Sequence, residues 1–232
     1  MTPPAAPGHH EEAAELAALA RALYLRGWMP GTSGNLSVRL AGGDRDKALI
    51  TASGLGKGEL AAEHMVVVGA ESGATVLAPD GLRASAETSI HSAIYRTTGA
   101  GAVIHVHAPY STVVACRAGD RSRRTTLELT HFELLKGLGL ADPSGADVPV
   151  FPNWPDVPRI AAEVAEYLTS RPQASCGLLI VDHGITVWGG DLAEARNRLE
   201  CFESVCQLLT LGAADLRTRP SAPTTTNPIT ED

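Results

Sequence analysis

Cysteine is scarce in this sequence, and its few copies are scattered. They are Cys116, Cys176, Cys201 and Cys206, and no two of them form a CxxC pair. This distribution argues against a disulfide framework and against a zinc site built from cysteines. We therefore expect reduced thiols, most of them packed in the interior.

Aromatic residues and positive charge are also in short supply. Aromatic side chains make up 4% of the chain, and 19 Lys and Arg residues face 26 Asp and Glu residues, for a formal net charge of −7. The chain has neither a basic surface nor an abundance of base-stacking rings, so we expect no nucleic-acid partner. A small anionic ligand could still bind at a local site.

Lysine is the rarer of the two basic residues. Only Lys47, Lys57 and Lys136 occur, against sixteen arginines. None of the three lies in an apolar strand, the setting that would lower the pKa of an amine for Schiff-base chemistry. If the protein activates a carbonyl group, we therefore expect it to do so with a metal ion.

Long apolar runs are missing as well. The longest stretch without Asp, Glu, Lys or Arg, residues 97–116, contains two histidines, a proline and several hydroxyls, which bilayer hydrocarbon tolerates poorly. The first ten residues have no basic region followed by an apolar one, so a secretory signal is not expected. These features predict a cytoplasmic protein with no membrane span.

What the chain does have is enough apolar residues to bury a core. It is 232 residues long and 44% hydrophobic. Residues 1–10 and 216–232 are rich in Pro, Thr and Ser without apolar periodicity, and we expect them to be disordered tails. No linker or repeat interrupts residues 11–215, which predicts a single domain.

Hydrophobic periodicity predicts alternating helices and strands. Helices are expected at 11–26, 86–97, 110–117, 159–169 and 192–211. Strands are expected at 35–40, 48–51, 65–69, 102–107, 177–181 and 185–188. The last two strands are too close for a crossover helix and should be antiparallel neighbours. The result is a mixed sheet with helices covering its faces.

The strongest local signal for chemistry is a His-x-His pair on a predicted strand. Strand alternation places His105 and His107 on one face, about 7 Å apart along the strand, so both rings can reach one cation. The alternative is a pair of half-buried histidines bonded to nearby polar groups. We favour the metal site because the pair lies at a strand end that opens into a loop.

A third ligand is needed for a metal that activates a substrate, with one position left open. His183 is the best candidate because it lies between two apolar strands, with Gly184 after it to let the backbone turn. A lone histidine at such a turn can also be purely structural. We expect the remaining five histidines to be non-ligands: His9, His10, His64, His91 and His131.

Two segments rich in glycine and hydroxyls, residues 31–37 and 51–57, could bind phosphate through backbone N–H groups. Ser85, at the start of a helical pattern, could donate to a phosphate or act as an ordinary N-cap. Each signal is weak alone, since such strings are often plain turns. Residues 54–58 lack the spacing of a nucleotide-binding P-loop, which excludes that site.

Six strings in this order resemble the class II aldolase/adducin family over about residues 12–212. They are residues 27–39, 50–54, 85–88, 103–107, 130–137 and 182–189. The resemblance implies an α/β fold, a three-layer α/β/α arrangement around a central mixed, largely antiparallel sheet, assembled as a homotetramer. It also implies one Zn²⁺ ion per chain on His105, His107 and His183. The implied phosphate pocket consists of Gly34, Asn35, Ser53, Gly54 and Ser85.

Within the family, the strings at 27–39 and 182–189 most resemble the branch that dehydrates 5-methylthioribulose 1-phosphate to 2,3-diketo-5-methylthiopentyl 1-phosphate in methionine salvage. The catalytic acid/base implied by that branch is Glu133, whereas the family's aldolases imply Glu87. Both residues are present, so the division of roles stays open. One alternative is a sugar-phosphate aldolase or epimerase. Another is a non-catalytic adducin-like binding module, but such a module would not need the three histidines.

Overall fold

One mixed sheet forms the centre of the computed structural model, which describes residues 9–171 and 176–221. Its strands are β1 (Asn35–Arg39), β2 (Lys47–Thr51), β3 (Met65–Gly69), β4 (Thr75–Leu77), β5 (Ala102–Val106), β6 (Thr125–Thr130), β7 (Gly145–Phe151), β8 (Gly177–Ile180), β9 (Gly184–Gly189) and β10 (Arg217–Pro220). The α-helices are α1 (His10–Leu25), α2 (Thr88–Thr98), α3 (Pro109–Ala118), α4 (Val157–Ser170) and α5 (Leu192–Thr210). Four short 3₁₀ helices are η1 (Gly42–Asp44), η2 (Lys57–Glu59), η3 (Ala62–His64) and η4 (Glu133–Leu138).

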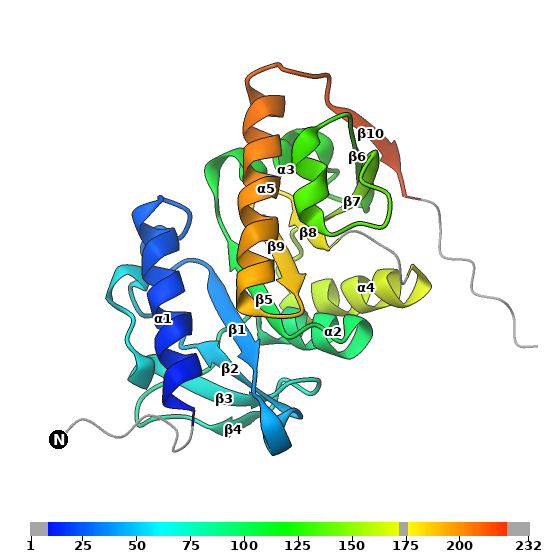
Figure 1. Cartoon of the computed structure of the whole chain (residues 1–232). Helices are drawn as coiled ribbons and strands as arrows, with labels where there is room; N and C mark the ends of the chain where they lie inside the picture. The colour runs from blue at the N-terminus through cyan, green and yellow to red at the C-terminus, as the bar shows by residue number, and fades with distance from the viewer. Residues whose placement is uncertain (1–8, 172–175, 222–232) are drawn as a thin grey trace, which may run out of the picture.

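The helices form two layers around this sheet. The strand order is β10-β6-β7-β8-β9-β5-β1-β2-β3-β4. Every named pair is antiparallel except β7 with β8. Apolar residues of α1, α3 and α5 pack in the core on one face, and those of α2 and α4 pack on the other (Figure 1). The structure thus confirms the predicted α/β/α arrangement with a largely antiparallel sheet.

The sequence missed four strands whose side chains do not follow the expected pattern. All residues of β4 are exposed. Threonines and Glu128 interrupt the apolar pattern of β6, and Asp147 and Pro149 interrupt that of β7. β10 lies in the segment predicted to be a disordered tail from residue 216. That prediction is wrong for residues 217–220, which pair with β6 while Arg219 forms ion pairs with Glu128 and Asp147. Backbone pairing and charge hold this edge strand, so no apolar periodicity marks it.

The predicted tails otherwise fall largely outside the described residues. At the N-terminal end, α1 begins at His10, one residue before the predicted start. Residues 1–8 and 222–232 are not described. No helix in the described ranges has the length and hydropathy needed to cross a bilayer.

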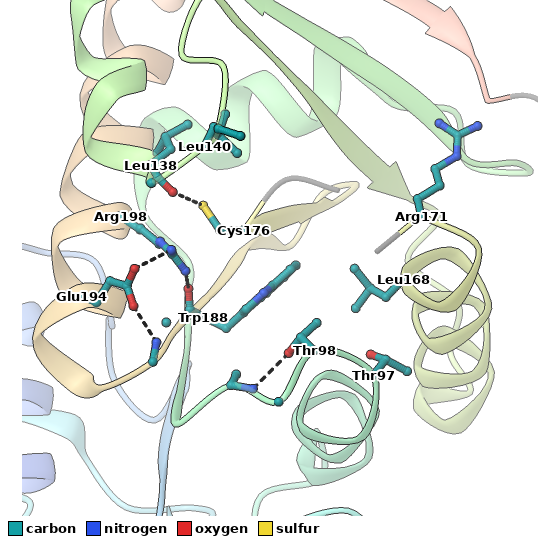
Figure 2. A pocket seen from close by; sticks show the side chains of 16 residues that line it. Thr97, Thr98, Leu138, Leu140, Leu168, Arg171, Cys176, Trp188, Glu194 and Arg198 are labelled. Atoms are coloured by element: carbon teal, nitrogen blue, oxygen red, sulfur yellow. Dashed lines mark hydrogen bonds and ion pairs between the residues drawn. The ribbon is translucent and has the colours of Figure 1, made fainter. Parts of the chain in front are cut away.

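The sheet has two ends, and one of them carries the predicted metal ligands. The pairing of His105 with Thr186 and of Ile180 with Gly184 puts the His-x-His pair and His183 at the same end. The opposite end holds a cavity of about 430 Å³ beside Trp188, where Arg198 forms an ion pair with Glu194 (Figure 2). None of the predicted site residues lines this cavity.

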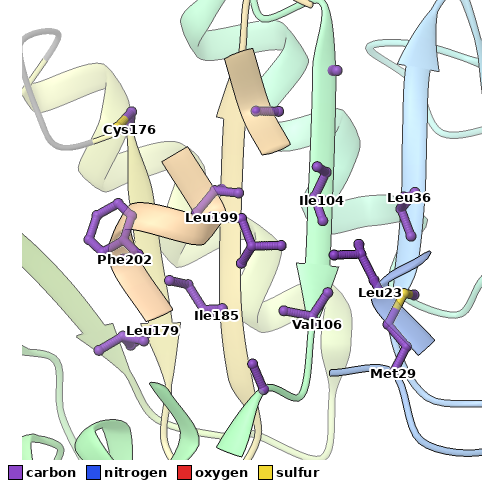
Figure 3. Close-up of a cluster of buried hydrophobic side chains, with 14 of the residues drawn as sticks. Leu23, Met29, Leu36, Ile104, Val106, Cys176, Leu179, Ile185, Leu199 and Phe202 are labelled. Carbon is purple, nitrogen blue, oxygen red and sulfur yellow. The ribbon is translucent and has the colours of Figure 1, made fainter. Parts of the chain in front are cut away.

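Alternation along β5 separates the core from the site. Ala102, Ile104 and Val106 point into the core under α1, α3 and α5, where Leu199 and Phe202 of α5 also pack (Figure 3). The intervening positions of β5 face the layer of α2 and α4. His105 is on that second face, 2% exposed. The apolar side of β5 therefore anchors the strand while its other side presents a ligand.

Candidate active site

Three histidines converge at one end of the sheet. The ring centroids of His105, His107 and His183 lie 5.0, 4.8 and 4.6 Å apart, and one ring nitrogen from each falls within 4.8 Å of the others. The Nε2 atoms of His105 and His183 are 3.2 Å apart. Within the described ranges this is the one group of three or more His, Cys, Asp or Glu residues with metal-ligand spacing.

The backbone turn that positions His183 between β8 and β9 occurs at Asp182, whereas the sequence analysis predicted it at Gly184. Asp182, with φ of 56°, takes the left-handed conformation, and its carboxylate accepts a hydrogen bond from Arg121 Nε at 2.8 Å. Gly184 is needed for another reason, because a Cβ atom there would lie 2.2 Å from the carbonyl oxygen of Val106. Glycine thus allows β9 to approach β5 closely enough for His183 to face His105.

Gly34 brings the first glycine-rich segment against the same strand. It has φ of +76°, and an added Cβ atom would lie 2.9 Å from the carbonyl oxygen of His105. Asn35 then pairs with His105 in the sheet. The residues of the predicted phosphate segment are therefore held next to the histidines by backbone contacts.

Glu87 is the carboxylate at this centre. It lies immediately before α2 and is 14% exposed; its Oε1 is 2.9 Å from His183 Nε2 and its Oε2 is 3.4 Å from His105 Nε2. Asn35 Nδ2 donates a hydrogen bond of 2.6 Å to Oε2. Burial alone would raise the pKa of Glu87, but the two histidines and Asn35 outweigh burial and hold that pKa below its ordinary value. Glu87 is therefore an ionised carboxylate aimed at the three rings.

Two of the three histidines have the protonation state that a metal needs. Burial, with the charges of neighbouring rings, lowers the pKa of His105 and of His107 to about 4, so both are neutral near pH 7. Nδ1 of His105 hydrogen-bonds to Thr186 Oγ1 at 3.0 Å, which fixes the ring and leaves Nε2 directed at the centre. Nδ1 of His183 is buried and has no hydrogen-bond partner among the described residues. This donor set fits a divalent cation held by three imidazoles with an open position.

A cavity of about 230 Å³ opens beside the histidines and contains most of the predicted phosphate residues. Its lining includes Gly34, Asn35, Ser53, Ser85, Glu87, His107 and His183. Gly54 does not line it, although its φ of +80° turns the chain directly after Ser53. The hydroxyl of Ser85 accepts a hydrogen bond from the Glu87 backbone N–H, but Ser85 is not the N-cap of α2, because α2 begins at Thr88 and its N-cap position is Glu87. The residues before α2 and the first residue of α4, Val157, both border the cavity, so two helix N-termini favour an anion there.

Glu133 lies far from this centre within the same chain. β6 begins with Thr125 opposite Val150, at the histidine end of the sheet, and finishes with Thr130 opposite Gly145, at the other end. The side chain of Glu133, three residues later, is 81% exposed and forms an ion pair of 2.7 Å with Lys136. The structure therefore brings Glu87 to the histidines and leaves Glu133 on the surface.

Two buried charged residues near the site were missed by the sequence analysis. Lys57 is 1% exposed and lines the cavity. Glu203 of α5 is 3% exposed and accepts hydrogen bonds of 2.9 Å from the backbone N–H groups of Tyr110 and Ser111, which fixes the start of α3 just after His107. Glu203 gives no local signal. Lys57 gives a weak local signal, because it is a lysine between two glycines in a chain that has only three lysines.

Known proteins share both the sequence and the fold. A Nocardia farcinica protein named "probable bifunctional methylthioribose-1-phosphate isomerase/methylthioribulose-1-phosphate dehydratase" is 53% identical over 199 residues, which are 86% of this chain and 35% of that protein. This chain thus spans about a third of that relative. Proteins named methylthioribulose-1-phosphate dehydratase from Leptospira biflexa and Microcystis aeruginosa are 37% and 41% identical, covering 84% of this chain and 94% and 92% of theirs.

Solved structures agree with this relationship. YgbL of Escherichia coli superposes with a TM-score of 0.73 at 26% identity, covering 92% of this chain and 95% of that one. L-Fuculose-1-phosphate aldolase of Thermus thermophilus gives a TM-score of 0.63 at 26% identity, covering 87% and 94%. Residues 14–210 match the family model described as the class II aldolase and adducin N-terminal domain. Because that match includes β1 to β9, the three histidines and the cavity, the chain belongs to the class II aldolase and adducin family.

Proposed function

We propose that this chain removes water from 5-methylthioribulose 1-phosphate to give 2,3-diketo-5-methylthiopentyl 1-phosphate, as a metal-dependent hydro-lyase of methionine salvage. The observation that carries the proposal is an ionised, largely buried carboxylate beside three converging imidazoles, next to a cavity lined by small hydroxyls. Relatives at 37–53% identity with dehydratase names point to the same reaction. The reaction breaks the C3–H and C4–OH bonds, and the resulting enol becomes the second ketone.

The proposed cofactor is Zn²⁺, held by His105, His107 and His183. When bound, it supplies a Lewis acid that polarises the substrate carbonyl and makes the C3 proton more acidic. Imidazole nitrogens suit zinc, although other divalent ions accept the same ligands. Thr186 keeps the ring of His105 oriented during turnover through its bond to Nδ1.

Glu87 is the acid/base that this chain supplies to its own site. Its ionised form can accept the C3 proton, and either the same carboxyl group or a second one can then protonate the departing C4 hydroxyl. The hydrogen bond from Asn35 to Oε2 fixes the orientation of the carboxylate toward the histidines. This role needs no movement of the chain, because Glu87 already borders the cavity.

Glu133 is the second proposed catalytic glutamate, and it acts on a neighbouring subunit of a homotetramer. The sheet places it at the end opposite the histidines of its own chain, so it can reach only another chain's site. Its high exposure leaves the carboxylate free to enter such an interface. A division of labour follows in which one glutamate removes the C3 proton and the other protonates the leaving hydroxyl.

The phosphate of the substrate occupies the cavity beside Gly34, Asn35, Ser53, Gly54 and Ser85. Gly54 contributes by turning the chain after Ser53. Backbone N–H groups of such turns and the N-termini of α2 and α4 favour a doubly charged anion.

The test is product analysis with the purified protein loaded with Zn²⁺. Incubation with 5-methylthioribulose 1-phosphate should give a product lighter by one water, with the ultraviolet absorbance of a 2,3-diketone. An aldolase would instead release a two-carbon methylthio aldehyde and a triose phosphate by breaking the C3–C4 bond. That pair of products, or an epimer of unchanged mass, would overturn the dehydratase proposal.

A further inference from the structure

The Lys57 ammonium group is buried in the cavity without a carboxylate partner. Its Nζ atom donates hydrogen bonds to the carbonyl oxygens of Thr32 at 2.9 Å and Leu55 at 3.1 Å. Its backbone N–H donates to the carbonyl oxygen of Gly31 at 3.0 Å. An ammonium group has three N–H donors, so one remains for a further acceptor. Among the ion pairs of the described residues, none involves Lys57.

A buried charge that lacks an ion-pair partner is costly. Two carbonyl dipoles compensate an ammonium group only in part, and burial lowers the pKa of Lys57, with Glu87 opposing that shift from a distance. A residue whose only task was to join two loops could do so with a neutral donor. The buried positive charge indicates that the natural occupant of the cavity is negative.

The surroundings of Lys57 define which anion fits. Among the described residues that line this cavity, Lys57 is the one lysine or arginine. Ser53 and Ser85 supply small hydroxyls, and the chain as a whole carries a net charge of −7, which repels anions elsewhere. A compact ammonium group among small donors suits the tetrahedral phosphate group better than a planar carboxylate, for which the arginine fork is the usual partner.

We propose that Lys57 is the counter-ion for the phosphate monoester of the substrate and the main determinant of its affinity. The proposal rests on the proposed function in that the substrate carries a phosphate. It goes beyond that function by replacing a pocket of backbone N–H groups and hydroxyls alone with one organised around a buried cation. The bonds to Thr32 and Leu55 then serve to hold Nζ in place between the two glycine-rich segments.

The first experiment measures binding of inorganic phosphate to the full-length, zinc-loaded protein by titration calorimetry. Lys57→Gln keeps N–H donors but loses the charge, and should lower phosphate affinity about 10- to 100-fold, the loss expected for one charged hydrogen bond. Lys47→Gln is the matched control, because Lys47 pairs with Asp44 away from the cavity, and its affinity should be unchanged. Wild-type affinity in a folded Lys57→Gln protein would overturn the proposal.

A second experiment needs no Lys57 variant and uses the scarcity of lysine. In protein labelled with ¹⁵N-lysine, the Nζ resonances of three lysines can be followed while inorganic phosphate is added. Only the Lys57 resonance should shift and saturate; its assignment follows by elimination from Lys47→Gln and Lys136→Gln. Equal shifts at all three lysines, or none at Lys57, would contradict the proposal even if Lys57→Gln does not fold.

These outcomes also separate this proposal from the proposed function. A protein that binds phosphate through Lys57 but does not dehydrate 5-methylthioribulose 1-phosphate keeps the counter-ion and loses the substrate assignment. A protein that dehydrates the substrate with an unchanged KM in Lys57→Gln keeps the reaction and loses the counter-ion. If both hold, Lys57→Gln should raise KM more than it lowers kcat, because the phosphate is bound equally in ground and transition states.

Discussion

The chain segments that begin α2 and η4 each carry a glutamate, and the two surroundings could hardly differ more. Glu87 is 14% exposed and faces His105, His183 and Asn35, whereas Glu133 is 81% exposed and contacts Lys136. The first carboxylate is held ionised by neighbours that fix its direction. The second sits in an exposed ion pair of the kind that adds little to stability.

This contrast shows that burial gives two chemically identical carboxylates different chemical roles. A carboxylate in water meets a proton donor of any orientation, while a buried one acts only along the direction that its hydrogen bonds allow. Glu87 therefore has a built-in target in its own chain. Glu133 gains one only if another chain covers it.

The largest effect is expected at the histidines that Glu87 faces. His183→Ala should lose bound metal and all measurable turnover, because two imidazoles leave a site too weak to hold the ion. Metal content by atomic spectroscopy and activity should fall together, with the circular dichroism spectrum unchanged. His131→Asn is the matched control, since His131 is exposed and its φ of 67° suits asparagine. Full metal content in both His183→Ala and His105→Ala would contradict the site.

The next largest effect is expected at Glu87. Glu87→Gln should keep metal and phosphate binding but lower kcat about 10²- to 10⁴-fold, the usual cost of removing a positioned acid/base. Glutamine retains the size of the side chain and can still contact Asn35, so the change isolates proton transfer. Steady-state kinetics and metal analysis on the same preparation give the result. A decrease of less than threefold would remove Glu87 from catalysis.

Glu133→Gln should lower kcat by a smaller factor, about 10²-fold. Unlike the loss in Glu87→Gln, this loss should be recoverable by mixing subunits. If Glu133 acts on a neighbouring chain, mixing Glu133→Gln with His183→Ala and allowing subunits to exchange should restore activity. Random exchange gives about a quarter of the sites an intact histidine set and an intact Glu133. Mixing Glu87→Gln with His183→Ala should restore nothing, because both residues belong to one chain's site. Recovery of activity in that second mixture would show that Glu87, and not only Glu133, acts on the histidines of another chain.

The smallest effect concerns stability and pH. The pKa of His105 and of His107 is lowered from 6.5 to about 4 in the folded chain, so the unfolded chain binds more protons between those values. Their contribution to stability is present above pH 6.5 and is lost as pH falls toward 4. For metal-free protein, the free energy of unfolding should fall about 1.4 kcal/mol per pH unit for each such proton.

Urea unfolding after chelation, at pH 7, 6 and 5, measures this slope. His107→Asn should reduce it by one proton because one suppressed titration is removed. An unchanged slope in that variant would show that the ring of His107 is not held neutral by the fold.

Local pattern was sufficient to predict the elements that carry the histidines. Strand alternation at 102–107 and the apolar strands around His183 are properties of neighbouring residues, and the structure has β5, β8 and β9 at those positions. β6, β7 and β10 escaped because threonines, charges and Pro149 hide the alternation, and pairing with distant strands holds them in place. The hydroxyl of Ser85 was predicted with both alternatives open, and the structure shows its bond to Glu87 N–H.

Alternate residues of an extended chain point to the same face, so the sequence was enough to name His105 and His107 as candidate metal ligands. It could not decide between Glu87 and Glu133, nor reveal that Lys57 is buried. Those outcomes depend on burial and on contacts between residues far apart in the chain, such as Glu87 with His183. The sequence does not show whether a charged side chain is buried or which groups it contacts. The tertiary structure decides both, and these surroundings determine its charge state and its function.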